Sequence, residues 1–329
     1  MIVRFWGTRG SIPVSVTTDH IRAKLRTALR TARDRAAAGE RLDSDESIER
    51  FLDDLGFDVA GTFGGHSSCV EIEIGEDGGD APTEHVVCDM GSGARPYGQR
   101  MMERFGPGRP QAYHVFMSHV HWDHIMGFPF FTPVYIPGNR IVIHGCHAEL
   151  EFAFRRQQAA PSFPVDFSML GAKVEFDVLR PGQSYDIAGM RVSARKQRHA
   201  GDSYGWRFER NGKVVVYSTD SEHRLEEMGE VRELVEFFRG ADLVVFDAMY
   251  SLADAVSVKA DWGHSSNIVG VELCQQAEAQ RLCLFHHEPA YDDAQIQRVL
   301  QETRRFEEIT RTAAPLEILS AWDGLEITL

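Results

Sequence analysis

The segment Ser118–His124, which reads Ser-His-Val-His-Trp-Asp-His, constrains this chain more than any other part of its 329 residues. It places three imidazoles and one carboxylate within six positions, at His119, His121, Asp123 and His124. Imidazole nitrogens suit zinc and similar borderline metals, and a carboxylate adds the charge that a second cation needs. Loops rarely concentrate these ligand types at ligand spacing, so the segment predicts a metal site rather than a histidine-rich surface loop.

The residues around this segment predict where the metal site lies in the fold. Residues 112–118 are mostly apolar, which is typical of a buried strand. The chain then turns, so the potential ligands follow the end of a strand. From such a turn, His119 and His121 can point toward one ion, while Asp123 and His124 face a neighbouring ion.

Composition limits the classes of protein to which the chain can belong. An apolar content of 43% is enough for a sizeable core, and the formal charge of −14 disfavours duplex DNA as a partner. A small phosphate ester would still bind, because bound divalent cations reverse the local sign of the charge. The five cysteines are odd in number and contain no C-x-x-C pair, so we expect reduced, buried thiols. Without a leader-like or membrane-spanning apolar run, we expect a cytoplasmic protein with no membrane partner.

The H-x-H-x-D-H pattern resembles the signature of the metallo-β-lactamase superfamily of dinuclear hydrolases. Three further segments are similar to its tRNase Z-like branch and occur in the expected order: the Gly-rich start at residues 5–13, Ser67-Ser68-Cys69, and the strand and turn at residues 87–93. The resemblance implies an α/β fold, the metallo-β-lactamase-like αββα four-layer sandwich, formed by residues 1–329 as a single domain. Strands that alternate with helices along the chain fit this layered architecture.

The resemblance also implies three remote metal ligands, at His199, Asp220 and His286. It divides the ligands between two ions: His119, His121 and His199 hold the first, Asp123, His124 and His286 hold the second, and Asp220 bridges them. Spacing alone does not separate His286 from the adjacent His287, although the place of His286 directly after an apolar strand favours it. We expect two divalent cations, Zn²⁺ with Mn²⁺ as the alternative, that activate a bridging hydroxide for attack.

Expelling an alkoxide at neutral pH requires a proton donor, for which histidine is suited. The resemblance points to His264, with Asp247 as its acidic partner, and Asp123 completes the expected catalytic set. The alternative role for His264 is capping the helix that begins near Ser266. We expect four residues to contact substrate: Ser265, Ser266, His287 and His66.

Several aromatic and apolar residues follow or interrupt the metal segment and predict either a pocket wall or core. These residues are Trp122, Met126, Phe128, Phe130 and Phe131, joined by Trp262 from a distant segment. Such side chains can stack on a base, although an aromatic run is more often part of a core.

The segment at about 19–57 predicts a helical-hairpin insertion. Ile21, Leu25 and Leu29 recur at helical spacing, and Ser44 is placed to cap a second helix. The first helix is rich in arginine. The insertion therefore predicts either a hairpin that packs on the rim or joins a homodimer, or a cationic lid that grips substrate phosphate.

The function that these features favour is hydrolysis of a small phosphodiester of the cyclic nucleotide or dinucleotide class. One alternative is a tRNA 3′-processing endonuclease. The acidic charge, the compact pattern of residues 154–195 and the Glu288-Pro289-Ala290 sequence after the last histidines all fit tRNA poorly. A second alternative is an acyl hydrolase, either a lactonase or a thioesterase, which would use the same ligands without the Asp247 and His264 pair.

Overall fold

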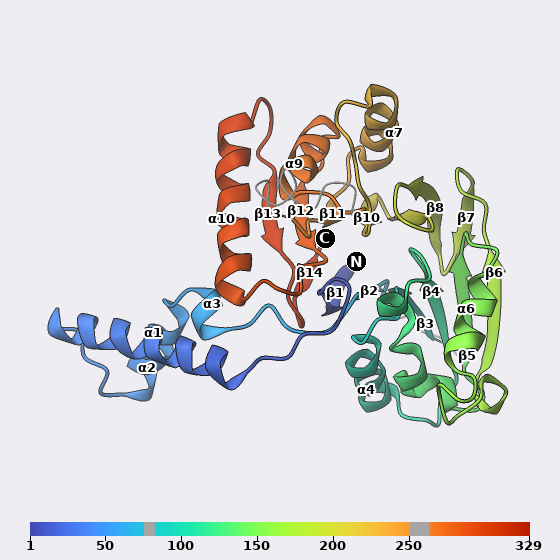
Figure 1. Cartoon of the computed structure of the whole chain (residues 1–329), viewed down its shortest axis with the longest axis horizontal. Coiled ribbons are helices and arrows are strands. Elements are labelled where there is room, and N and C mark those ends of the chain that lie inside the picture. Colours follow the sequence, from blue (N-terminus) through green and yellow to red (C-terminus); the bar gives the residue numbers. More distant parts are fainter. Residues whose placement is uncertain (76–82, 251–262) are drawn as a thin grey trace.

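The computed structural model describes residues 1–75, 83–250 and 263–329. Within these ranges the strands form two seven-stranded sheets, and helices lie on the outer face of each sheet (Figure 1). The predicted αββα four-layer sandwich is confirmed by this arrangement.

The first sheet is antiparallel at one edge and parallel at the other. Its strand order is β14-β1-β2-β3-β4-β5-β6, and the pairs from β3 to β6 are parallel. The bounds are β1 Ile2–Gly7, β2 Cys69–Glu73, β3 Thr83–Cys88, β4 Gln111–Phe116, β5 Arg140–Gly145, β6 Lys173–Val178 and β14 Glu326–Thr328. All six residues of β4 are buried, as expected for a parallel strand that is covered on both faces.

The second sheet has the same mixture of directions. Its order is β13-β12-β11-β10-β9-β8-β7, in which β10 to β13 are parallel and β7 to β10 antiparallel. The bounds are β7 Ser184–Ile187, β8 Met190–Gln197, β9 Ser203–Arg210, β10 Lys213–Ser218, β11 Leu243–Asp247, β12 Arg281–Phe285 and β13 Glu317–Ser320. Asn211 and Gly212 form the hairpin turn that joins β9 to β10, and both residues have positive φ, as such a turn requires.

Three apolar clusters hold the four layers together. One lies between the sheets and includes Phe5, Phe116, Trp206 and Phe285. The second packs α4 and α6 on the first sheet, and the third packs α7, α9 and α10 on the second. The helix bounds are α4 Ala94–Phe105, α5 Trp122–Ile125, α6 Leu150–Gln157, α7 Met228–Phe238, α9 Asn267–Gln276 and α10 Asp293–Thr310, with short 3-10 turns η1 Phe128–Phe130, η2 Thr132–Tyr135 and η3 Phe167–Met169.

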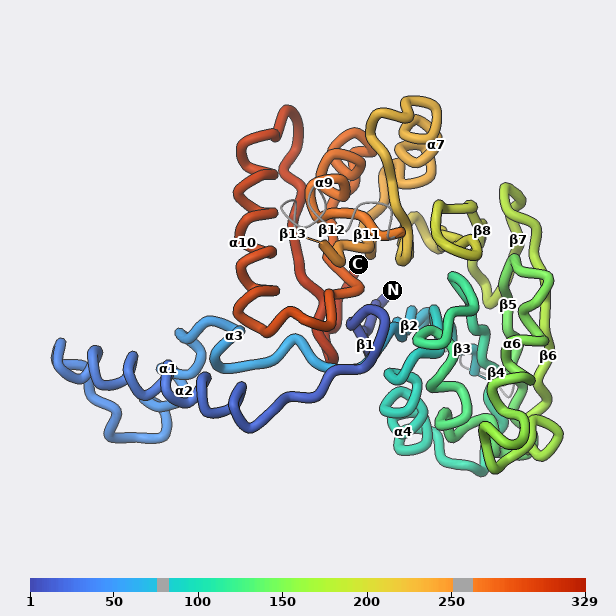
Figure 2. Tube along the Cα trace, in the orientation of Figure 1, coloured from blue at the N-terminus to red at the C-terminus, as the bar shows by residue number. Residues whose placement is uncertain are grey.

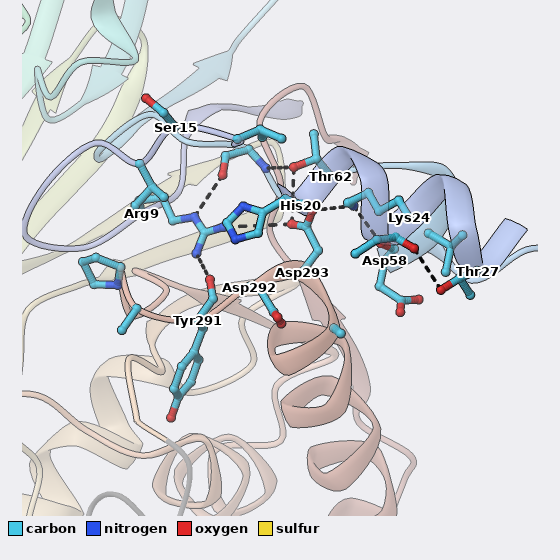
Figure 3. A pocket seen from close by; sticks show the side chains of 18 residues that line it. Arg9, Ser15, His20, Lys24, Thr27, Asp58, Thr62, Tyr291, Asp292 and Asp293 are labelled. Carbon is cyan, nitrogen blue, oxygen red and sulfur yellow. Dashed lines mark hydrogen bonds and ion pairs between the residues drawn. The ribbon is translucent and has the colours of Figure 1, made fainter. Parts of the chain in front are cut away.

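The segment between β1 and β2 forms three helices: α1 Thr18–Ala37, α2 Asp45–Asp53 and α3 Phe57–Ala60. Helices α1 and α2 project away from both sheets, whereas α3 lies beside α10 (Figure 1). None of the α1 residues is buried. Lys24 anchors α1, because its Nζ donates to the carbonyls of Asp58 and Gly61 and forms an ion pair with Asp293 at 2.5 Å (Figure 3). Beside this anchor, the Arg9 guanidinium donates to the carbonyls of Gly64 and Tyr291.

The two ends of the chain meet in the first sheet, where β14 pairs with β1 (Figure 2). Across the described ranges, no helix combines the length and the apolar character that crossing a bilayer requires. All five cysteines are free thiols, and four of them are buried.

Candidate metal centre

The predicted ligands come from turns that follow the carboxyl ends of strands in both sheets. The segment His119–His124 follows β4, His199 follows β8, Asp220 follows β10 and His286 follows β12. Because these strand ends meet at one edge of the sandwich, side chains up to 167 positions apart in sequence come together there. The structure therefore brings together all seven residues that were predicted to bind metal.

Three histidines form the first half of the cluster. One ring nitrogen from each of His119, His121 and His199 lies within 4.8 Å of the others, and His199 Nε2 is 3.2 Å from His121 Nδ1. His119 is buried, whereas His121 is exposed, so this half opens to solvent. A substrate can therefore reach it from outside.

Asp220 joins this half to a second one formed with Asp123, His124 and His286. Its Oδ1 is 3.2 Å from Nε2 of both His124 and His286. Its Oδ2 lies on the other side, 3.7 Å from His119 Nε2 and 3.8 Å from His199 Nε2. The two oxygens of one carboxylate thus face the two groups of histidines, which is the geometry that a bridging ligand needs.

The protein already holds the outer ring nitrogens of two of these histidines, His124 and His199. His124 Nδ1 is 2.8 Å from an Asp89 oxygen, and His199 Nδ1 donates to the carbonyl of Gly263 at 2.8 Å. The inward Nε2 atoms of His119, His124 and His286 are buried and have no hydrogen-bond partner. Buried polar atoms are normally satisfied, so these three nitrogens fit metal coordination, and the contact with Asp89 fixes the tautomer of His124.

Electrostatics around the cluster favour neutral imidazole at His119 and an ionised Asp220. Burial, reinforced by His124, holds the pKa of His119 well below its ordinary value. Burial opposes ionisation of Asp220, but the adjacent His124 and His286 outweigh it and hold the pKa of this carboxyl well below its usual range. Metal ligands must be deprotonated, so neutral His119 and ionised Asp220 are both in the form that can bind a cation.

The backbone at two of the candidate ligands is strained. Asp220 has a φ of 45° and His286 a φ of 61°, a left-handed conformation that residues other than glycine rarely adopt. Each residue sits where its chain leaves a parallel strand, so the turn aims the side chain at the cluster. Strain of this kind persists when the surrounding structure enforces it, and it concentrates at functional sites.

Asp89 was not among the predicted site residues, although its segment contributed to the family resemblance. Its carboxylate is fully buried and accepts hydrogen bonds from Ser118 N, Ser118 Oγ and Tyr217 Oη, besides contacting His124. The contact with His124 fixes the ring of a candidate ligand. The signal in the sequence was an aspartate directly after a buried strand, where an unpaired carboxylate would be destabilising.

His264 lies beside the cluster and pairs with Asp247. Its Nδ1 is 2.8 Å from Asp247 Oδ2, and its ring centroid is 5.1 Å from that of His286 and 5.2 Å from that of His199. Burial would lower the pKa of His264, but the fully buried Asp247 raises it to about 9. The alternative capping role falls to Ser266, whose side chain accepts from Val269 N. His264 is therefore free to face the site as a protonated side chain.

The expected substrate contacts find less support. Ser265 Oγ donates to the carbonyl of Ser221, and Ser266 caps α9. The buried His287 donates from Nε2 to the carbonyl of Ala321 and packs on Phe63. The hydroxyls of both serines and the His287 ring therefore form hydrogen bonds within the protein, which stabilise the fold around the site and do not point to substrate contact. His66 contacts Ser92 through Nδ1 and remains a prediction.

The residues predicted as a pocket wall divide into two groups. Phe128 and Phe131 are fully buried in the apolar cluster beneath the first sheet, so they are core. Trp122 and Phe130 are 63% and 54% exposed and border a cavity together with Met126. Trp262 lies outside the described residues.

Sequence comparison identifies the family to which this site belongs. The family model described as "Beta-lactamase superfamily domain" matches residues 86–287, which is more than half of the chain and includes every candidate ligand. The chain belongs to this superfamily. With the histidine and aspartate cluster described above, it is a metal-dependent hydrolase, and the predicted resemblance is confirmed.

Individual relatives are distant in sequence but match over nearly their whole length. Ribonuclease BN of Escherichia coli is 22% identical over 285 residues, covering 70% of this chain and 88% of the relative. The metallo-β-lactamase fold protein YhfI from Bacillus subtilis has 15% identity and a TM-score of 0.62, covering 99% of this chain and 98% of its own. A diphosphatase from the PhnP family has 17% identity and a TM-score of 0.57, covering 100% and 97%. The two structures support the fold.

Proposed function

We propose that the protein is a dinuclear metal-dependent phosphodiesterase that hydrolyses a small phosphodiester of the cyclic nucleotide or dinucleotide class. The observation that carries this proposal is the pairing of His264 with buried Asp247 directly beside the cluster. A thioesterase at such a site would not need this pair, because the departing thiolate is a weak base that leaves without a proton donor. A phosphodiester expels an alkoxide, which does need one.

In this proposal the seven clustered residues are the metal ligands. His119, His121 and His199 would hold one cation, and Asp123, His124 and His286 would hold the other. Asp220 would contribute to both, because its two oxygens face the two groups of histidines. Nitrogen-rich ligands of this kind favour Zn²⁺, with Mn²⁺ as the alternative. When bound, two such cations supply an activated water and offset charge that develops on the phosphoryl oxygens.

The other residues of the site act on protons and orientation. Asp247 accepts at Oδ2 from Ser221 N as well as contacting His264, so its carboxylate is fixed in place. It holds the His264 ring with Nδ1 toward itself and leaves Nε2 to donate a proton to the departing oxygen. Asp123 combines the proposed ligand role with accepting the proton of the attacking water, as a carboxylate at the cation pair can.

Two of the similar proteins support this proposal through the reactions that their names describe. One structural neighbour is a diphosphatase and one sequence relative a ribonuclease, both of which cleave phosphoric ester or anhydride bonds. The net charge of −14 favours a small substrate over a long polyanion.

Ribonuclease activity is the second candidate, and two observations favour it. They are the likeness to Ribonuclease BN and four exposed arginines on the projecting helix α1: Arg22, Arg26, Arg30 and Arg33. Against it, residues 154–195 form the end of α6, the turn η3 and the strands β6 to β8, all packed on the sheets. In this proposal that stretch supplies no extended arm for RNA.

A panel of substrates tests the proposal. The purified protein, loaded with Zn²⁺ or Mn²⁺, is assayed with bis(p-nitrophenyl) phosphate, cyclic nucleotides, dinucleotides, a tRNA precursor and a lactone. We expect turnover of the small phosphodiesters and none of the lactone. Preferential cleavage of the tRNA precursor would favour the ribonuclease, and turnover of the lactone alone would overturn the phosphodiesterase.

A further inference from the structure

A second hollow lies next to the candidate metal centre, between the metal-binding turn and α6. It is a cavity of about 780 Å³, bordered on one side by Trp122, Met126 and Phe130 and on the other by Phe152 and Arg156. Sites for small organic molecules span roughly 300–1,000 Å³ and are lined mainly by apolar and aromatic groups. The cavity therefore has the size and the lining of a ligand site.

The aromatic side chains of this cavity are unusually open to water. Among the described residues, three phenylalanine or tryptophan side chains are largely exposed: Trp122, Phe130 and Phe152. All three border this cavity. Their neighbours Phe128 and Phe131 are fully buried, so the local sequence is able to cover its rings. Clustered exposed apolar surface of this kind marks a binding site.

The cavity is bordered by residues of the same turn that carries four of the candidate ligands. Trp122 stands between the candidate ligands His121 and Asp123, so its backbone belongs to the metal-binding turn. The opposite wall is fixed to the same turn, because Gln157 Nε2 donates to the carbonyl of Ile125 at 2.8 Å. A molecule in this cavity would therefore be held at a defined position relative to the cluster.

The chemistry of the walls selects the occupant. The Phe130 ring meets Phe163 edge to face, with centroids 5.6 Å apart, so it is held in a fixed orientation. Aromatic faces bind flat π systems, and stacking on a base contributes about 1–3 kcal/mol per base. Arg156 and Glu149, both exposed at this cavity, offer a donor and an acceptor to a polar ring edge.

We propose that this cavity, defined by Trp122, Phe130, Phe152 and Arg156, is the subsite that receives the nucleobase of the substrate. The inference rests on the proposed phosphodiesterase function and extends it, because it identifies the organic part of the phosphodiester. It makes nucleotide phosphodiesters better substrates than alkyl ones with the same leaving group. The competing occupant, a second copy of the chain, is separated by the test below.

The test compares two chromogenic substrates that differ only in the retained group, thymidine 5′-(p-nitrophenyl phosphate) and ethyl p-nitrophenyl phosphate. The wild-type enzyme should prefer the thymidine ester in kcat/KM by about 10- to 100-fold, as one stacked base predicts. The double variant F130A/F152A should lose most of that preference through a raised KM. The matched control is Ile309→Ala, because Ile309 is 67% exposed on α10 and lies outside the cavity.

Binding without turnover separates this inference from the proposed function. Metal-stripped protein is titrated with AMP and with ribose 5-phosphate, and tryptophan fluorescence is followed. Quenching by AMP alone, lost in F130A/F152A, supports the subsite even if no phosphodiester is cleaved. Absence of AMP binding together with equal kcat/KM for both esters would overturn it. So would a change from dimer to monomer in F130A/F152A, measured by sedimentation, with the thymidine preference intact. Circular dichroism verifies that the variant is folded.

Discussion

At the scale of single residues, the site separates side chains that would bind cations from side chains that orient them. His264 belongs to neither group, because it contacts Asp247 on one side and the cluster on the other. Its proposed role is proton donation, so its loss should slow the chemical step and leave the ligands untouched.

Replacing His264 with Gln tests this role. Loss of a positioned proton donor lowers turnover by typically about 10²–10⁴-fold. We expect kcat for phosphodiesters that expel an alkoxide, such as cyclic nucleotides, to fall within that range while the content of bound cations, measured by plasma emission, stays the same. The control is His20→Gln, on the exposed face of α1. Undiminished turnover would remove His264 from the mechanism.

Asp89 provides the matching test of orientation. The change Asp89→Asn removes the charge that faces His124 Nδ1 and disturbs the bonds from Ser118 and Tyr217. Loss of such an outer partner weakens metal affinity by about 10–100-fold. Competition with a chromogenic chelator measures the affinity, with exposed Asp186→Asn as the control. Equal affinities would show that Asp89 acts only on folding.

At the scale of elements, pairing between strands creates a buried acid. Glu71 on β2 is 2% exposed, and its Oε2 accepts from Trp6 Nε1 on β1 at 3.0 Å. Burial, only partly offset by this bond and by Arg4, raises the pKa of Glu71 to about 6. The folded state therefore holds this proton more tightly than the unfolded chain does.

Linkage turns that shift into a pH dependence of stability. The contribution of Glu71 is fully present below its unfolded pKa of 4.5 and is lost as pH rises through about 6. One and a half units correspond to about 2 kcal/mol. The free energy of unfolding of metal-free protein is measured with urea at pH 4.5 and at pH 7. Between these two values, the fall in this free energy should be smaller in Glu71→Gln than in wild type by about 2 kcal/mol. Glu326→Gln, which alters an exposed partner of Arg4, should not show this difference. Identical pH profiles for Glu71→Gln and wild type would contradict the assignment.

The projecting helix α1 shows what periodicity can and cannot predict. The spacing of Ile21, Leu25 and Leu29 correctly predicts a helix, and Ser44 caps the next helix as expected. The apolar stripe, however, is 50%, 58% and 70% exposed at these three positions. Whether a neighbour covers a stripe depends on tertiary placement, which local spacing does not encode.

A double substitution on this helix separates the two proposed substrate classes. The variant Arg26→Ser/Arg30→Ser removes two exposed charges outside the clustered site. We expect kcat/KM for small phosphodiesters to stay within about twofold of wild type, because exposed charges are largely screened beyond about 10 Å. Loss of activity on a tRNA precursor, if it is cleaved, would assign the arginines to RNA. A raised KM for small phosphodiesters would instead support the lid.

At the scale of the whole molecule, the sequence predicts the four-layer fold and the metal-binding turn because both depend on local or familial patterns. Four of the candidate ligands lie in one short segment, residues 119–124, and such a concentration of histidine and aspartate is typical of a metal site. The remote residues His199, Asp220 and His286 required the family resemblance, since strands far apart in sequence bring them together. Side-chain direction was beyond reach: the serines at 265 and 266 and His287 lie near the site but bond to the protein.

The proposed mechanism requires two cations held at one edge of the sandwich. The direct measurement is the content of divalent metal per chain, determined by plasma emission on protein dialysed against Zn²⁺, for wild type and for His119→Ala and Asp220→Asn. We predict two ions per chain in wild type, a loss in His119→Ala, and a larger loss in Asp220→Asn because its two oxygens face both groups of histidines. A wild-type protein that retains fewer than two ions, or variants that retain the full content, would contradict the proposed two-cation site.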